Sequence, residues 1–316
     1  MSRQQRAELD AMIRRSQRDA SAEAGASDGP PSVERLRAGF RAMMAEMIVP
    51  SGIRTRPTTL GSRPALLVEP SGAPEPGTIL YFHGGSYVVG SPRTALSLTG
   101  NLVSRTGVRA LSLDYRLAPE HPFPAAIEDA LDAYRALLDG GEDPSAIVFA
   151  GDSAGGGLAV TTCLAARDAG LPLPSAIVTF SAGLDMTRTG PSMDDKADVD
   201  PYLTREGLLH TGAMYLAGQD PWQPLLSPAV LADLTGFPPM LLQSGSNEIV
   251  LDDSTRLAAR AREAAVDVVL DVVADVPHVF QAFAGVLEEA DDALDRAALF
   301  LSRRIRARDA VPARQG

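Results

Sequence analysis

The sequence is poor in the residues on which several classes of protein chemistry depend. Its 316 residues include one cysteine, Cys163, one lysine, Lys196, and four histidines. A single thiol cannot form an internal disulfide or a cysteine-rich zinc site. The lysine lies in an acidic stretch and lacks the shielded or glycine-rich setting that Schiff-base enzymes and phosphate-binding loops require. The remaining chemistry is that of hydroxyl groups, carboxylates and imidazoles, and we expect neither a metal nor a cofactor.

Charge and hydropathy argue against two kinds of partner. The formal net charge is -11 at pH 7 and the arginines gather at the chain ends, so nucleic acid is not an expected partner. The same negative charge disfavours anionic substrates. The longest stretch without a charged residue, 76–92, has 17 residues with four glycines, which does not suit a transmembrane helix. The N-terminal residues alternate in charge, unlike a secretory signal, and the expected compartment is the cytoplasm.

From residue 53 onward, short apolar runs alternate with turns. Eight runs are typical of strands and lie at 53–60, 63–70, 78–85, 108–116, 145–153, 175–183, 238–246 and 267–275. Several are continuously apolar, as strands covered on both faces are. Helical patterns at 122–141 and 253–265 separate later strands. The alternation predicts an α/β fold with a mostly parallel eight-stranded sheet between helices and ligands at the carboxyl ends of the strands.

Two segments fall outside this alternation. The first 52 residues predict helices broken by a loop at 24–32, and the second helix carries an apolar run that needs a partner surface. Residues 184–227 combine a polar loop with a short amphipathic helix and are too long for a simple connection. We therefore expect N-terminal cap helices at 1–52, a core at 53–183 and 228–308, a cap insertion at 184–227 after the sixth strand, and a flexible tail at 309–316.

Ser153 is the candidate nucleophile. It lies in the string GDSAGGG at 151–157, which follows an apolar strand and precedes a helical pattern. Glycines on both sides of a serine prevent clashes at a sharp strand-to-helix turn and expose the hydroxyl. The strand and helix around the string make this prediction more specific than the string alone.

The serine needs a general base, and the four histidines can be compared by position. After a serine in this kind of turn, the acid and then the histidine follow along the chain. His83 and His121 precede Ser153. His210 falls on a helix inside the insertion, where a surface histidine is the simpler interpretation. His278 directly follows the last predicted strand and is the expected base.

The base needs an orienting carboxylate, and the loop after the seventh predicted strand offers Glu248, Asp252 and Asp253. Glu248 lies nearest the strand end and is preferred. Asp252 and Asp253 open the next helix, where acidic residues commonly cap the helix or interact with its dipole. Asp252 stays open as the alternative acid.

Backbone amides that stabilise an oxyanion are expected in two places. Gly84 and Gly85 follow the third predicted strand and expose successive N–H groups, and Ala154 follows the nucleophile. These three amides form the expected oxyanion hole, in which each donor lowers the barrier by about 2.7–4 kcal/mol.

The sequence resembles the hormone-sensitive-lipase-like esterases, also called bacterial family IV, of the α/β-hydrolase fold. Five strings carry the resemblance in the family's order: HGGS at 83–86, DYRLAPEHPFPAA at 114–126, GDSAGGG at 151–157, GSNEIVLDDS at 245–254 and PHVFQAF at 277–283. The resemblance implies a serine carboxylesterase with a Ser-acid-His triad, an oxyanion hole and a cap built from the N-terminal helices and the insertion. Within the second string, we interpret Arg116, Glu120 and His121 as buried scaffold groups.

Two positions depart from the family pattern. Ser86 replaces the usual third glycine, which leaves Gly84 and Gly85 as the expected donors. Glu248 stands at the acid position, which is aspartate in many relatives. It precedes His278 by 30 residues, similar to the family's spacing, whereas Asp252 would precede it by 26.

The resemblance implies hydrolysis of esters with short acyl chains through an acyl-enzyme. The candidates for the acyl pocket are Tyr87, Met43, Met47, Tyr202 and Leu208. Family members often form dimers, so a homodimer is compatible with the resemblance. Two alternatives stay open: the same triad could open a lactone or remove an acetyl group from a small metabolite, and a non-catalytic receptor could bind a ligand in the same fold. The intact triad argues against the receptor.

Overall fold

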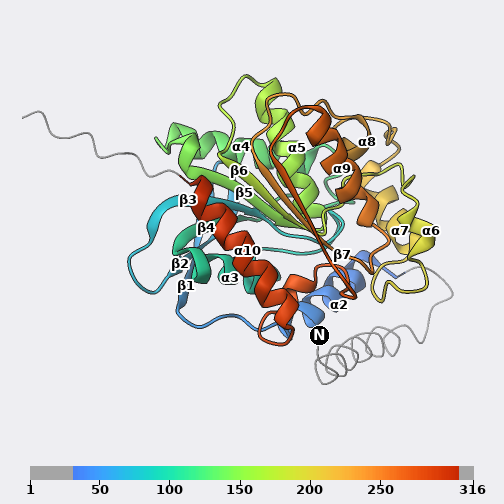
Figure 1. Ribbon diagram of the computed structural model, residues 1–316, viewed down its shortest axis with the longest axis horizontal. Coiled ribbons are helices and arrows are strands. Elements are labelled where there is room, and N and C mark those ends of the chain that lie inside the picture. The colour runs from blue at the N-terminus through green and yellow to red at the C-terminus, as the bar shows by residue number, and fades with distance from the viewer. Residues whose placement is uncertain (1–30, 306–316) are drawn as a thin grey trace, which may run out of the picture.

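One sheet of eight strands runs through the molecule, which is described for residues 31–305 of a computed structural model (Figure 1). The strands are β1 (Ile53–Leu60), β2 (Arg63–Pro70), β3 (Glu75–Phe82), β4 (Val108–Leu113), β5 (Ile147–Asp152), β6 (Ala176–Phe180), β7 (Met240–Gly245) and β8 (Val268–Val273). Their spatial order is β1-β2-β4-β3-β5-β6-β7-β8. β2 is antiparallel to both of its neighbours, and all other adjacent pairs are parallel. The predicted mostly parallel α/β architecture is confirmed, and each predicted run overlaps one strand.

Helices cover both faces of the sheet (Figure 1). α3 (Leu96–Thr106) and α10 (Glu288–Arg304) pack on one face, and α4 (Ala125–Asp139), α5 (Ala154–Asp168) and α9 (Leu251–Glu263) pack on the other. α4 and α9 correspond to the helices predicted at 122–141 and 253–265. α9 begins two residues earlier than its pattern predicted.

Strand β3 shows why the central strands have continuously apolar sequences. Ile79 and Tyr81 belong to the core cluster that includes α3 and α10, whereas Leu80 and Phe82 belong to the cluster that includes α4 and α5. All four side chains are fully buried. Because both faces of this strand are covered, it has no solvent side on which polar residues would alternate with apolar ones.

The remaining helical segments lie outside these layers. They are α2 (Val33–Ala45), α6 (Ser192–Asp195), α7 (Arg205–Leu216), α8 (Pro228–Leu231) and the short 3-10 helices η1 (Pro144–Ala146) and η2 (Phe280–Phe283). α6 and α7 belong to the insertion between β6 and β7, and Figure 1 shows α2 on the same side of the molecule. The earlier N-terminal helix and the tail at 309–316 lie outside the described residues. Within residues 31–305, no helix is long and apolar enough to cross a membrane.

Arg37 ties α2 to the loops that follow β3 and β4. Its guanidinium contacts both carboxylate oxygens of Glu120 at 2.7 Å and donates to two backbone carbonyl groups at 2.9 and 3.1 Å. Glu120 and His121 are exposed, so their interpretation as buried scaffold groups is wrong, because this part of the segment lies at the surface beside α2. Arg116 is partly buried and pairs with Asp129 at 2.8 Å.

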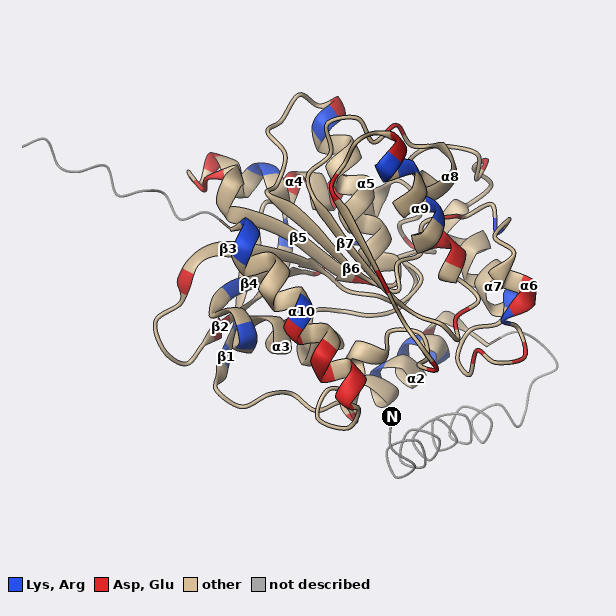
Figure 2. Ribbon diagram, in the orientation of Figure 1, with Lys and Arg blue, Asp and Glu red and all other residues tan. Residues whose placement is uncertain are grey.

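Charged residues are spread over the outer elements (Figure 2). α10 carries acidic residues in its first turn and basic residues in its last turn, which complements the helix dipole. Over the elements that the structure describes, the basic residues do not form one continuous face (Figure 2).

Candidate active site

Ser153 occupies the turn between β5 and α5. Its backbone has φ 51° and ψ -120°, a combination that costs energy for a residue with a side chain. The turn is fixed because the Ser153 amide donates to the carbonyl of Phe180 at 2.8 Å, and the Ser153 carbonyl accepts from the amides of Gly157 and Gly183. The predicted sharp strand-to-helix turn is therefore present.

Two glycines make this turn sterically possible. A Cβ atom added to Gly155 would overlap the backbone carbonyl oxygens of Phe82 and His83 at the end of β3. A Cβ atom added to Gly151 would overlap the carbonyl of Gly155. The glycines on either side of Ser153 thus allow the turn to pack directly against the end of the neighbouring strand.

The side chains of Ser153, His278 and Glu248 come from separate loops and form one hydrogen-bonded cluster. The Nε2 atom of His278 lies 3.0 Å from the Ser153 hydroxyl, and its Nδ1 atom lies 2.8 Å from Oε2 of Glu248. Oε1 of Glu248 accepts hydrogen bonds from the hydroxyl of Ser181, at 2.7 Å, and from the amide of Gly245. The carboxylate is fully buried, so these partners replace the water that it would otherwise bind.

The environment of His278 favours its protonated form. Burial of the ring lowers the pKa, but the hydrogen bond and the negative charge of Glu248 outweigh this effect and raise the pKa of His278 above its ordinary value. A neutral ring hydrogen-bonded to Glu248 through Nδ1–H presents the lone pair of Nε2 to Ser153. This arrangement can accept a proton from the serine and hold it.

The alternative acid lies elsewhere. Asp252 accepts a hydrogen bond from the amide of Ser192 at 2.7 Å and one from the hydroxyl of Thr255 at 3.1 Å, and it makes no contact with His278. Asp253 accepts from two backbone amides of the insertion at 2.7 and 3.0 Å, and burial raises its pKa to about 7. Both aspartates connect α9 to the insertion.

The other three histidines are not part of this cluster. His83 is fully buried, donates to the carbonyl of Gly84 at 2.8 Å and stacks on Tyr115, and burial lowers its pKa to about 4. His121 is exposed. His210 lies on α7, and its side chain does not line the pocket above Ser153.

The loop after β3 differs from its prediction in one respect. Gly84 is buried against Asp152, whose carboxylate accepts a hydrogen bond from the Gly84 backbone, and burial raises the pKa of Asp152 to about 6. Gly84 and Gly85 do not line the pocket, whereas Ser86 and Ala154 do. Ser86 has φ 53°, a conformation that glycine adopts without strain. Of this loop, Ser86 and Tyr87 line the pocket.

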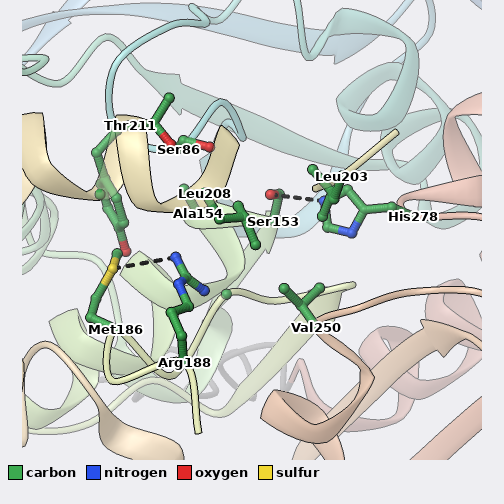
Figure 3. A pocket seen from close by; sticks show the side chains of 13 residues that line it. Ser86, Ser153, Ala154, Met186, Arg188, Leu203, Leu208, Thr211, Val250 and His278 are labelled. Carbon is green, nitrogen blue, oxygen red and sulfur yellow. Dashed lines mark hydrogen bonds between the residues drawn. The ribbon is translucent and has the colours of Figure 1, made fainter. Parts of the chain in front are cut away.

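A narrow pocket opens above Ser153 (Figure 3). Its lining residues are Ser86, Tyr87, Ser153, Ala154, Gly183, Met186, Arg188, Leu203, Leu208, Thr211, Gly212, Val250 and His278. Its accessible volume is about 20 Å³, enough for about one or two water molecules. The side chains are contributed by the ends of core strands on one side and by the insertion on the other.

The predicted pocket residues divide into two groups. Tyr87 and Leu208 line the pocket. The ring of Tyr87 stacks on the ring of Tyr215 on α7, with 4.0 Å between the ring centroids. Met43, Met47 and Tyr202 are not among the lining residues. Met47 and Tyr202 pack instead against the apolar cluster around Phe283.

Several lining residues were not anticipated. Thr211 and Gly212 follow the predicted Leu208 at helical spacing on α7, and this periodicity could have identified the face of the helix that covers the pocket. Met186 and Arg188 lie in the polar loop after β6, where no sequence pattern indicates which side chains turn inward.

Comparisons with known proteins agree with this architecture. Residues 79–282 match the family model described as alpha/beta hydrolase fold. The chain is 44% identical over 224 residues to an acetyl-hydrolase of Streptomyces hygroscopicus, covering 71% of this chain and 75% of that protein. It is 38% identical over 217 residues to an esterase of Acinetobacter venetianus, covering 68% of this chain and 71% of that protein.

Solved structures extend the similarity to almost the whole chain. A crystal structure of an esterase from the bacterial hormone-sensitive lipase family has a TM-score of 0.89 and 40% identity, and the match covers 97% of this chain and 100% of that chain. A hormone-sensitive lipase from a metagenome library has a TM-score of 0.86 and 38% identity, with coverage of 93% and 98%. The chain therefore belongs to the bacterial hormone-sensitive-lipase family of the α/β-hydrolase fold and is a carboxylic ester hydrolase.

Proposed function

We propose that the protein hydrolyses esters with short acyl chains through an acyl-enzyme formed on Ser153, with His278 as base and Glu248 as orienting acid. The observation that carries the proposal is the continuous hydrogen-bonded chain from the Ser153 hydroxyl through both ring nitrogens of His278 to Glu248. A neutral serine becomes an effective nucleophile when such a base removes its proton as it attacks.

The first half of the reaction forms the acyl-enzyme. Ser153 Oγ attacks the ester carbonyl carbon while His278 Nε2 takes its proton, and the positive ring that results is stabilised by Glu248. The proton then passes from His278 to the departing alkoxide, which leaves as the alcohol.

The second half regenerates the serine. Water attacks the acyl carbon, His278 accepts its proton, and the collapse of the second tetrahedral intermediate breaks the bond to Ser153 and releases the acid. The proton on His278 returns to the serine oxygen. The net reaction consumes one ester and one water and yields one acid and one alcohol.

Three backbone amides are proposed as donors to the oxyanion: those of Gly85, Ser86 and Ala154. Within the described residues none of them donates a hydrogen bond to the protein backbone. Ala154 is the first residue of α5, where an amide has no partner inside the helix, and both it and Ser86 line the pocket. Gly84 is not included because its backbone already contacts Asp152.

The pocket dimensions support a preference for small acyl groups. An accessible volume of about 20 Å³, enough for about one or two water molecules, favours a small acyl group over a long alkyl chain. Leu208 and Val250 supply apolar contacts for a methyl or ethyl group. We expect kcat/KM for a series of straight-chain esters to peak at acetyl to butanoyl and to fall at longer chains. A maximum at eight carbons or more would contradict the proposed preference.

The role of Ser153 is tested by the variant Ser153→Ala. We expect it to lose hydrolysis of p-nitrophenyl butanoate and to lose covalent labelling by a fluorophosphonate, because both require the hydroxyl. The circular dichroism spectrum and melting temperature serve as the folding control. Retention of most of the activity would rule out the acyl-enzyme, and absence of labelling in the wild-type protein would favour a non-catalytic receptor.

Removal of an acetyl group from a small metabolite is a second candidate. It is favoured by the similarity to a protein named as an acetyl-hydrolase. The same triad would cleave an acetate ester, or an acetamide if His278 protonates the leaving amine. Release of acetate from paired O-acetyl and N-acetyl substrates distinguishes the two bonds.

A further inference from the structure

We propose that Arg188 binds an anionic group of the substrate, so that the enzyme acts on esters that also carry a carboxylate. This inference rests on the proposed function and names a substrate class for the same site. Arg188 lines the pocket together with Ser153, and Figure 3 shows its side chain extending from its loop into the pocket. Among the described residues that line the pocket, it is the only one with a permanent charge, and none is acidic.

The backbone holds Arg188 in a conformation that needs support. Its φ is 55°, in the left-handed region that side chains with a Cβ atom disfavour. The loop around it is fixed by Asp185, which is buried and accepts hydrogen bonds from the amides of Thr187 and Thr189 at 2.8 and 3.3 Å. These contacts fix the backbone that carries the Arg188 side chain at the pocket beside Ser153.

The nearby carboxylates have other partners. Asp185 pairs with Arg256 at 3.2 Å in addition to its contacts within the loop. Asp253 accepts from two backbone amides, and the positive charge of Arg188 opposes the rise in its pKa without a direct ion pair. Within the described residues, the side chain of Arg188 makes one hydrogen bond, from Nη2 to the sulfur of Met186 at 3.5 Å.

A thioether is a weak acceptor, so most of the donor capacity of Arg188 stays available to a ligand. A guanidinium presents paired N–H groups that match the two oxygens of a carboxylate. The site also lies beside the nucleophile, so a molecule held by Arg188 has its ester group within the same pocket as Ser153. These features together favour a substrate with one ester and one carboxylate.

The net charge of the chain does not contradict this substrate class. The value of -11 suggested that anions are disfavoured, but charges distributed over the surface are screened beyond a Debye length of about 8 Å at physiological ionic strength. An arginine in direct contact with the ligand is screened far less. The charged side chain that lines the pocket therefore decides, and Arg188 is positive.

The carboxylate could belong to the acyl or to the alcohol part of the ester, and matched substrates distinguish these sources. Ethyl butanoate is the neutral reference. Ethyl hydrogen butanedioate replaces the terminal methyl of its acyl chain by a carboxylate, and butanoyloxyacetate replaces the terminal methyl of its alcohol. Acid release gives kcat/KM for each ester, and each charged-to-neutral ratio measures recognition of the anion.

We expect Arg188→Gln to lower one of these two ratios by about 10-fold to 100-fold, as the loss of a charge-assisted hydrogen bond does. Arg188→Lys should keep part of the preference because it keeps the charge. Arg205→Gln is the matched control, since Arg205 pairs with Asp194 outside the pocket and its removal changes the net charge equally. The ratios of this control should equal those of the wild type.

The inference is overturned if neither ratio falls further in Arg188→Gln than in Arg205→Gln. Should Arg188→Gln fail to fold, the wild-type protein decides, because a carboxylate bound by Arg188 requires at least one charged ester to have a higher kcat/KM than ethyl butanoate. Ratios below one for both charged esters would then reject it. If Ser153→Ala abolishes hydrolysis of all three esters but the ratios in Arg188→Gln are unchanged, the role of Arg188 is rejected. The proposed hydrolysis then stands.

Discussion

Glu248 uses both of its oxygens, and each oxygen has different partners. One accepts from the ring of His278, and the other accepts from the hydroxyl of Ser181 and the amide of Gly245. The Ser181 hydroxyl also accepts from the amide of Val279, directly after His278. Ser181 therefore holds both the carboxylate of Glu248 and the loop that carries the imidazole of His278. In the proposed mechanism, this arrangement lets a glutamate take the place of a shorter aspartate, because the acid needs only to be fixed at hydrogen-bond distance from the ring.

Replacing Glu248 by glutamine tests the orienting role. The amide can keep its oxygen toward Ser181, which turns its NH2 group toward His278 Nδ1 and forces the ring into the tautomer that cannot accept a proton from Ser153. We expect kcat to fall by about 10³-fold to 10⁴-fold while the protein stays folded. Steady-state kinetics with p-nitrophenyl butanoate measure the change, and Glu248→Asp is the control that keeps the charge. A loss of less than tenfold in Glu248→Gln would exclude this role.

The pH dependence of the wild-type protein has a defined sign. The proposed mechanism requires neutral His278, so we expect kcat/KM to rise as the pH increases through the pKa of this residue, which Glu248 raises above its ordinary value. In Glu248→Gln the largest raising contribution is absent, and only the charges of Asp200 and Asp152 then oppose burial, which lowers the pKa of His278. The acidic limb of the residual activity should therefore move to lower pH. A limb that stays in place would indicate that another group controls it.

At the scale of elements, periodicity was sufficient to predict the sheet and its crossover helices but not the direction of individual loops. Continuous apolar runs identify buried strands because both of their faces are covered, as Leu80 and Tyr81 illustrate. The strand-to-helix turn at Ser153 was also readable, since its glycines have a local steric cause. In contrast, no local pattern distinguishes Asp252 from Glu248. The carboxylate of Asp252 is engaged by the amide of Ser192 in the insertion, which is sixty positions away along the chain. Such tertiary contacts leave no local pattern.

Arg37 provides a test of how α2 is attached. Its carboxylate partner Glu120 is half-exposed, so the ion pair alone contributes about 0–1 kcal/mol. Arg37 also satisfies two backbone carbonyl groups, and its loss leaves those acceptors without this donor. We expect Arg37→Ala to lower the free energy of unfolding by about 1–3 kcal/mol, and Glu120→Ala to have the smaller effect. Urea denaturation of both variants measures the difference, and equal losses would show that the ion pair dominates.

At the scale of the whole molecule, β8 forms one of the two edges of the sheet. This strand pairs with β7 on one side, and no other described strand pairs with its outer side. Val269 and Val272 of β8 are 45% and 42% exposed, which is unusual for valines of a sheet that is otherwise covered. Exposed edge strands tend to pair with a second chain unless they are blocked. The homodimer that the family resemblance allows thus has a defined candidate surface.

A dimer through this edge predicts a specific response to substitution. Two copies related by a twofold axis would place β8 beside its own equivalent and bury Val269 against the partner, so a lysine there would bring like charges together across the axis. We expect light scattering coupled to size exclusion to give twice 33.2 kDa for the wild type and 33.2 kDa for Val269→Lys. Leu209→Lys, at an exposed position of α7 in the insertion, is the control and should stay dimeric. A wild-type protein of 33.2 kDa at every concentration would contradict the dimer, and equal behaviour of the two variants would place its interface elsewhere.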